Sequence, residues 1–156
     1  MKVETKQLPL FHVAYMRHIG PYGRGVSQHW AKFSKWSKTH DLVVKGAVTL
    51  GISHDDPSVT PPEKCRYDAC ITVPADFKAG PEVNLADIPG GKYAVMAFKG
   101  SDRDIGKAWN DIYRQWLPDS GYQPDDRPCF ELYEERHQCH PGGVFECDIC
   151  IPVRQL

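Results

Sequence analysis

The amino-acid sequence predicts an α+β fold in which one domain, residues 1–156, is built from two similar halves. Two pairs of segments lead to this prediction. LPLFHVAYMRHIG (8–20) matches IPGGKYAVMAFKG (88–100), and YDACITV (67–73) matches CDICIPV (147–153). Both pairs match at the same shift along the chain, which takes Leu8 to Ile88 and is termed the internal offset. In both halves, a stretch with apolar residues at helical spacing follows the first segment, so the sequence indicates a duplicated unit.

The first half, about residues 6–74, is expected to fold as a strand, a helix and two further strands (βαββ). Its strands are expected within 8–20, 46–53 and 66–74. The helix is indicated by Val26, Trp30, Phe33 and Ser37, which follow the i, i+4, i+7, i+11 pattern. We interpret Trp30 as a core residue, together with the nearby Trp36.

The second half, about residues 85–154, is expected to repeat this order. Its strands are expected within 88–100, 128–135 and 145–153, and its helix is indicated by Ile105, Trp109, Ile112 and Trp116. The segment 74–84 is rich in turn formers and is expected to link the halves. Because each half alone is too small to bury a helix and a sheet well, we expect the two to pack together with pseudo-twofold symmetry and a ligand cleft between them.

Composition and charge exclude several classes of protein. Hydrophobic residues make up 41% and charged residues 25% of the chain, as is usual for a globular domain. The formal net charge is −1 and no basic run occurs, which argues against direct binding to nucleic acid. No stretch is long and apolar enough to span a membrane, and the start, MKVETKQLPL, lacks the apolar core of a signal peptide. We therefore expect a cytoplasmic protein.

The six cysteines are expected to be mostly free thiols packed as small apolar groups. CDIC invites a metal or redox interpretation, but in a strand Cys147 and Cys150 would point to opposite faces and could not hold one ion. The chain also contains no nucleophile elbow, phosphate loop or dinucleotide fingerprint. The sequence thus predicts neither a metal site nor a cofactor.

The stretch PCFELYEE (128–135) carries the candidate site. Read as a strand, it places Phe130 and Leu132 on a core face, and Glu131 on the other face between Cys129 and Tyr133. An unpaired buried carboxylate is costly, so Glu131 either reaches water or binds a positive partner. Arg127 or Arg136 of the chain itself would be such a partner.

The internal offset matches Glu131 with Gly51 in the first half. By the same alignment, Cys129 matches Thr49 and Tyr133 matches Ser53. The first half would then give the cleft an open wall at Gly51, and the second half a charged, aromatic wall. Such asymmetry suits a bound molecule better than a filled core, although a slip of one residue would reverse the faces.

Several segments resemble the GyrI-like family, which includes the DNA gyrase inhibitory protein and the effector-binding domains of some transcription regulators. The segments are HIGPY, DDPSVTPPEKCRYDACITVP, DIPGGKYAVMAFKG and DSGYQPDDRPCFELY, and the resemblance extends from about residue 8 to 153. It implies a duplicated βαββ fold with a ligand cleft, in which the acid of the FELY strand, here Glu131, meets cationic aromatic ligands. It also implies that Tyr133 and Tyr22 line the cleft. Trp109 is either a further ligand contact or a core residue.

Three functions are compatible with these residues. The leading expectation is a module that binds cationic or planar aromatic small molecules, with Glu131 as counter-ion, in drug or toxin response. The second is a hydrolase of cyclopropane-bearing genotoxins, in which Glu131 and Tyr133 would be the catalytic acid–base groups. The third is inhibition of DNA gyrase by protein contact.

Overall fold

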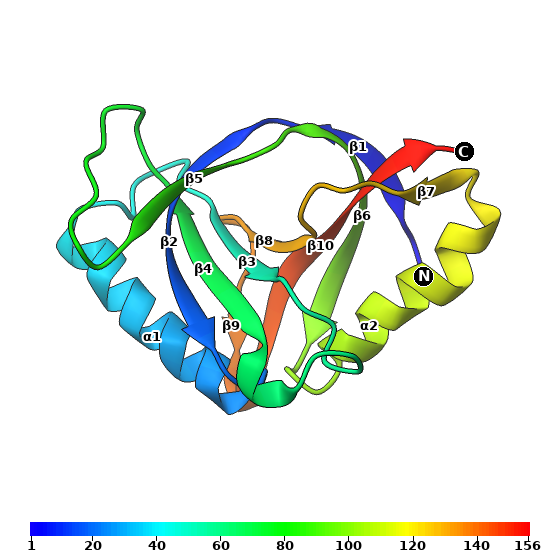
Figure 1. The fold of residues 1–156 in the computed structure, drawn as a ribbon, viewed down its shortest axis with the longest axis horizontal. Helices are drawn as coiled ribbons and strands as arrows, with labels where there is room; N and C mark the ends of the chain where they lie inside the picture. Colours follow the sequence, from blue (N-terminus) through cyan, green and yellow to red (C-terminus); the bar gives the residue numbers. More distant parts are fainter.

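The computed structural model describes residues 1–156, which form one curled, half-barrel sheet with two principal helices (Figure 1). The helices are α1 (Arg24–Thr39) and α2 (Ile105–Asp111), and α2 continues through a wider turn (Ile112–Trp116) and a 3-10 turn (Leu117–Asp119). The strands are β1 (Glu4–Leu8), β2 (Phe11–Ile19), β3 (Thr49–Ser53), β4 (Arg66–Thr72), β5 (Asn84–Ile88), β6 (Gly91–Gly100), β7 (Tyr122–Pro124), β8 (Phe130–Tyr133), β9 (Cys139–His140) and β10 (Val144–Gln155).

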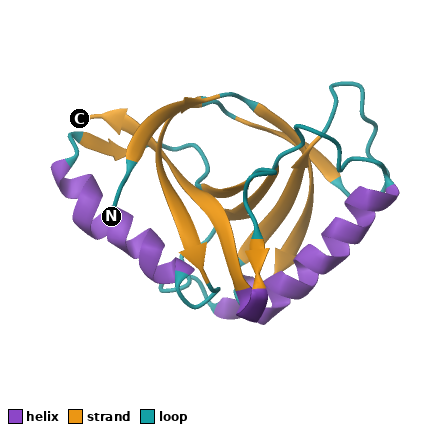
Figure 2. Cartoon of the chain, turned by 180° about the vertical axis from the view of Figure 1, so that it is seen from behind, coloured by secondary structure: helices purple, strands orange, loops and turns teal.

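The sheet is antiparallel, with the order β1-β6-β10-β8-β3-β4-β2-β5, and β7 and β9 pair with β10. The central pair, β3 and β8, joins the first half of the chain to the second. The two helices lie on either side of the strands, as Figures 1 and 2 show from opposite directions. None of the helices is long and apolar enough to cross a membrane.

The strands and helices expected in both halves are present, and their pairing repeats at the internal offset. Met16 of β2 lies opposite Ala69 of β4, and Met96 of β6 lies opposite Ile149 of β10. β1 and β5, by contrast, were not expected as separate strands. Each pairs with the first long strand of the other half, β1 with β6 and β5 with β2, so each half contributes an edge strand to the other.

One row of directly opposed residues crosses the sheet and explains where the site lies. The row is Met16, Ala69, Gly51, Glu131, Ile149 and Met96. Opposed residues of neighbouring strands share a face, so the side chains of this row, which Gly51 lacks, lie on one face of the sheet. The two ends of the row belong to the apolar clusters around α1 and α2. Gly51 and Glu131 are therefore left in the middle of the row, between the helices.

The opposite face of the sheet is filled by a third apolar cluster. It contains Phe130 and Leu132, the two residues of the FELY strand that the sequence assigned to the core. Cys150 lies in the same cluster, whereas Cys147 lies in the cluster beside α2, so the two cysteines of CDIC face opposite sides as expected. All six cysteines are free thiols.

Candidate ligand-binding site

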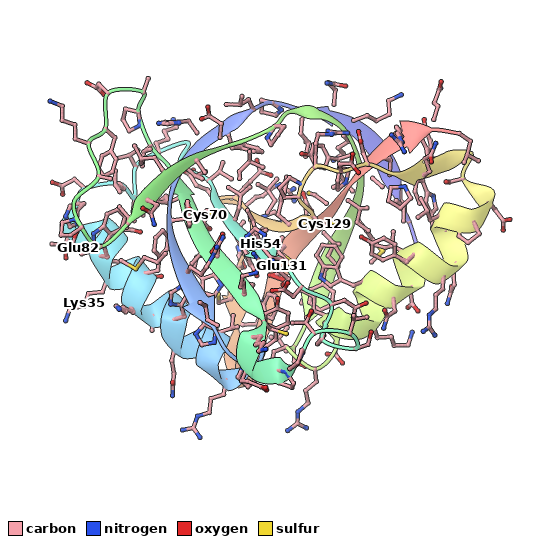
Figure 3. All side chains as sticks on the ribbon, in the orientation of Figure 1. Lys35, His54, Cys70, Glu82, Cys129 and Glu131 are labelled. Carbon is pink, nitrogen blue, oxygen red and sulfur yellow. The ribbon has the colours of Figure 1, made fainter.

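Glu131 is the centre of the candidate site. It lies in the middle of the molecule, on the short strand β8, and Figure 3 labels it between the two helices. Only 9% of its surface is exposed. The alternation of β8 places its side chain on the helix-bearing face, while Phe130 and Leu132 fix the strand from the other side. The predicted orientation of this strand is therefore confirmed.

Neutral groups are the partners of the Glu131 carboxylate. The hydroxyl groups of Tyr67 and Tyr133 both donate to Oε1, each at 3.2 Å. Glu131 takes part in no salt bridge, and the two expected partners, Arg127 and Arg136, pair with other acids. Oε2 receives neither hydroxyl.

Burial raises the pKa of Glu131 from an ordinary 4.5 to about 7. The hydrogen bonds from Tyr133 and Tyr67, and the nearby indole of Trp109, favour the charged form and hold the pKa below what burial alone would give. Burial also raises the pKa values of Tyr67 and Tyr133 far above their usual range, and the charge of Glu131 adds to the effect. Both phenols therefore stay protonated and act as donors.

Aromatic rings surround this carboxylate on the side of α1. Trp30 of α1 donates its indole N–H to the hydroxyl oxygen of Tyr67 at 2.8 Å. Its ring centroid lies 5.7 Å from that of Tyr133 and 6.3 Å from that of Tyr67, both in edge-to-face geometry. Tyr22 follows on the outside, 6.2 Å from Tyr67. Tyr22, Tyr67, Trp30 and Tyr133 thus form a continuous aromatic wall.

The residues proposed from the sequence occupy different places relative to Glu131. Tyr133 contacts it directly. Trp109 packs on the apolar cluster beside α2, as expected of a core residue, and its indole also favours the charged form of Glu131. Its contact with a ligand stays a prediction. Tyr22 is one ring further out, and its hydroxyl donates to the backbone carbonyl of Arg66 at 2.6 Å. Tyr22 therefore supports the aromatic wall from outside.

The expectation of an open wall at Gly51 is wrong. A Cβ atom at this position would lie 2.0 Å from the hydroxyl oxygen of Tyr67 and 3.0 Å from Oε1 of Glu131. The space above Gly51 is therefore filled by the phenol of Tyr67, which approaches the backbone more closely than any side chain at position 51 would permit. Gly51 belongs to the site because it makes room for Tyr67.

Tyr67 and Trp30 are the site residues that the sequence interpretation missed. Trp30 lies on the apolar stripe of its helix and packs against the α1 cluster, so its description as core is accurate but incomplete. Tyr67 could be placed only once the pairing of the strands was known. It lies two residues before Ala69 on β4, and Ala69 is paired with Gly51, so alternation places the phenol on the helix-bearing face.

Two other buried carboxylates are fully paired. Asp68 accepts two hydrogen bonds from Arg17, at 2.9 and 3.0 Å, and contacts Nε2 of His54 at 2.6 Å. Asp148, which matches Asp68 at the internal offset, pairs with Arg136 and His137. Both acids hold neighbouring segments together.

Two surface hollows lie away from Glu131. One, of about 420 Å³, lies beside α1 and is lined by Met16, Lys32, Lys35, Trp36, Thr39, His40 and Glu82. Figure 3 places its Lys35 and Glu82 at the edge of the molecule, far from the labelled Glu131. The other, of about 630 Å³, lies near the N-terminus and includes Met1, Lys2 and Lys6. Neither is lined by the residues of the candidate site.

Comparison of this chain with known proteins identifies the family to which it belongs. Residues 1–154 match the model of the GyrI-like small molecule binding domain, and the chain belongs to this family. A relative from Cronobacter sakazakii, named DNA gyrase inhibitor, is 33% identical over 156 residues, covering 97% of this chain and 93% of the relative.

Solved structures share the fold at lower identity. The crystal structure of the EcmrR C-terminal domain matches with a TM-score of 0.79 at 16% identity, covering 99% of this chain and 98% of that domain. The structure of SAV2435 bound to tetraphenylphosphonium matches with a TM-score of 0.58 at 18% identity, covering 99% of this chain and 94% of that one. The α+β architecture is thus shared with both of these structures.

Proposed function

We propose that this protein binds cationic, planar aromatic small molecules between α1 and α2, with Glu131 as the counter-ion, in response to drugs or toxins. The observation that carries the proposal is a buried carboxylate that has no cation of its own chain and is surrounded by aromatic rings. An unpaired buried charge is costly, and the same chain pairs its other buried acids. A ligand that brings a positive charge removes this cost.

The aromatic wall favours ligands that are both positive and apolar. The faces of Tyr and Trp rings attract a cation by about 0.5–2 kcal/mol each, more when water is excluded. They also bury the flat apolar body of an aromatic ligand. A strongly hydrated inorganic cation would gain little from such walls. The neighbour of known structure that holds tetraphenylphosphonium, an aromatic cation, is consistent with this choice.

The two halves are also proposed to be copies of one βαββ unit, about residues 6–74 and 85–154, related by a pseudo-twofold axis. The support is the pairing of β2 with β4 and of β6 with β10, which repeats at the internal offset. Such an axis would pass between the paired residues Gly51 and Glu131. The ligand would then lie where the two units meet.

Calorimetry with an aromatic cation tests the counter-ion role. We expect the 9-aminoacridinium cation to bind the wild type, and Glu131→Gln to weaken binding by about 2–5 kcal/mol, thirtyfold or more. Glu134→Gln is the matched control, because that acid is close in sequence but half exposed and pairs with Arg136. If the wild type and Glu131→Gln bind the cation equally well, the counter-ion role is wrong.

A hydrolase acting on cyclopropane-bearing genotoxins is a second candidate for the same site. The observation in its favour is the pKa of about 7 of Glu131, which suits a general base at neutral pH. Glu131 would take a proton from water, whose oxygen would bond to a ring carbon as the strained C–C bond breaks. Tyr133, hydrogen-bonded to Glu131 at 3.2 Å, would protonate the anion released by ring opening and recover a proton from Glu131. Incubation with a cyclopropanoid alkylator, followed by mass spectrometry, tests it. If mass spectrometry finds the alkylator unchanged after prolonged incubation, the reaction is excluded.

Inhibition of DNA gyrase is a third candidate, and it rests on the name carried by relatives such as the one from Cronobacter sakazakii. It would place the interaction on the protein surface, with gyrase as the partner. A supercoiling assay with several-fold molar excess of this protein tests it. Undiminished supercoiling would remove this candidate and leave the binding proposal untouched.

A further inference from the structure

The Tyr67 phenol occupies the space beside Glu131 that a ligand needs. Its hydroxyl oxygen lies above Gly51, where even a Cβ atom would be only 2.0 Å away. The same hydroxyl donates to Oε1 of Glu131 and accepts the indole N–H of Trp30. With 3% of its surface exposed, Tyr67 fills the middle of the site as completely as a core residue.

A ligand that packs against the charge of Glu131 from the side of Gly51 must displace this hydroxyl. Displacement breaks the hydrogen bonds to Glu131 and to Trp30, and moves the ring away from Gly51. The cost is the same for a positive and for a neutral ligand, because it is incurred before the ligand makes its own contacts. It therefore acts as a conformational equilibrium that precedes binding and lowers the observed affinity.

We propose that Tyr67 is the gate of the site, held closed by Trp30 and by the absence of a side chain at Gly51. The proposal rests on the proposed function and adds the residue that sets the affinity threshold for every ligand, whatever its charge. Glu131 then decides which ligands are preferred, and Tyr67 decides how tightly any of them binds.

The gate lies on the side of Glu131 that faces the first half of the chain, and the second half has no equivalent of it. At the internal offset, Tyr67 of β4 corresponds to Cys147 of β10, which lies in the apolar cluster beside α2. A thiol is too small to span the width that the Tyr67 phenol covers. Opening therefore depends on Tyr67 and on the rings that contact it, Trp30 and Tyr22.

Two variants weaken the closed position in different ways. Tyr67→Phe keeps the ring and removes both hydrogen bonds of the hydroxyl. Gly51→Ala keeps the hydroxyl but places a Cβ atom where it lies. Tyr133→Phe is the matched comparison, because it removes a hydrogen bond of the same 3.2 Å length to the same oxygen, without touching the space above Gly51.

The test measures the affinity of two probes of one ring system, the 9-aminoacridinium cation and neutral acridine, at about pH 8.5, where Glu131 is charged. We expect Tyr67→Phe to tighten the binding of both probes by about tenfold, as expected when two hydrogen bonds no longer oppose opening. Gly51→Ala, which also weakens the closed position, is expected to tighten the binding of both probes as well. Melting curves of each variant establish that it is folded.

If the Tyr67→Phe variant binds acridine no more tightly than the wild type does, the gate is overturned. An equal gain in Tyr133→Phe would also overturn it, since the effect would then come from the carboxylate alone. If neither probe binds to the wild type or to any variant, both the gate and the proposed function are overturned. If Glu131→Gln binds the cation normally while Tyr67→Phe still tightens both probes, the counter-ion role fails and the gate stands.

Discussion

Two kinds of buried carboxylate lie in the central part of this sheet, and they differ in what the chain provides for them. Asp68 and Asp148 each meet an arginine and a histidine of the same chain. Glu131, on β8, meets two phenols and an indole. The difference teaches that burial alone does not distinguish an acid that holds the fold together from one with the counter-ion role proposed for Glu131. The distinguishing feature is the absence of a cation that the fold itself supplies.

The pKa values follow the same division. Burial raises the pKa of Asp68, but the hydrogen bonds and charges of His54 and Arg17 outweigh it, so the pKa lies below its ordinary value of 3.8. For Glu131 burial prevails, and the pKa rises to about 7. Asp68 therefore stabilises the fold above its unfolded-state pKa and loses this contribution as the pH falls. Glu131 behaves in the opposite way, because its charged form is the disfavoured one.

The largest effect is expected when a paired acid loses its charge. Asp68→Asn leaves Arg17 and His54 without their partner and should lower the free energy of unfolding by about 3–5 kcal/mol. Urea unfolding at neutral pH measures the change. Asp87→Asn is the matched control, since Asp87 is exposed and contacts only His12, and a loss of less than about 1 kcal/mol is expected there. Equal losses in the two variants would contradict the structural role of Asp68.

The unpaired acid should show the reverse sign. A pKa raised from 4.5 to about 7 means that the folded protein loses about 3 kcal/mol of stability from Glu131 as the pH rises from about 4.5 to about 7. Glu131→Gln has no such group, so its stability relative to the wild type should increase by this amount over the same range. Denaturant unfolding of both proteins at about pH 5 and about pH 8 measures it. Parallel pH profiles would show that Glu131 is not desolvated.

A smaller effect is expected on ligand affinity as the pH changes. A cationic ligand requires charged Glu131, and the charged fraction rises about tenfold between about pH 6 and about pH 8 for a pKa of about 7. The affinity for the 9-aminoacridinium cation should therefore rise about tenfold over this range, with release of a proton. Glu131→Gln should bind with little dependence on pH. A flat profile in the wild type would mean that the cation does not pair with this carboxylate.

The sequence was sufficient to predict the helix and three strands of each half, and the face of the sheet on which Glu131 lies. Alternation in FELY assigned Phe130 and Leu132 to a core, and the internal offset matched Gly51 to Glu131, which are paired in the sheet. The first prediction rests on the alternation of side chains along a strand. The second rests on the internal repeat, which equates the two residues, and their pairing is a finding of the structure. The edge strands β1 and β5 were not predicted, because each pairs with the opposite half of the chain and no local sequence pattern indicates such pairing.

The filling of the site was beyond the reach of such patterns. A glycine in a strand indicates that another group approaches closely, but it does not say whether this group is a ligand or a side chain of the protein. Here it is Tyr67, which comes from another strand. Trp30 has its role through a hydrogen bond to that same phenol, so it could not be assigned before Tyr67 was placed.

The pairing of Gly51 with Glu131 also determines how many charges, and hence how many ligands, one chain accommodates. Directly opposed residues of neighbouring strands have Cβ atoms about 4.5–5.5 Å apart, and like charges at such positions repel. A second acid at position 51 would lie beside the first in the same dry space, and one of the two would remain protonated. The row across the sheet therefore admits a single buried anion, and a titration with an aromatic cation is expected to saturate at one molecule per chain.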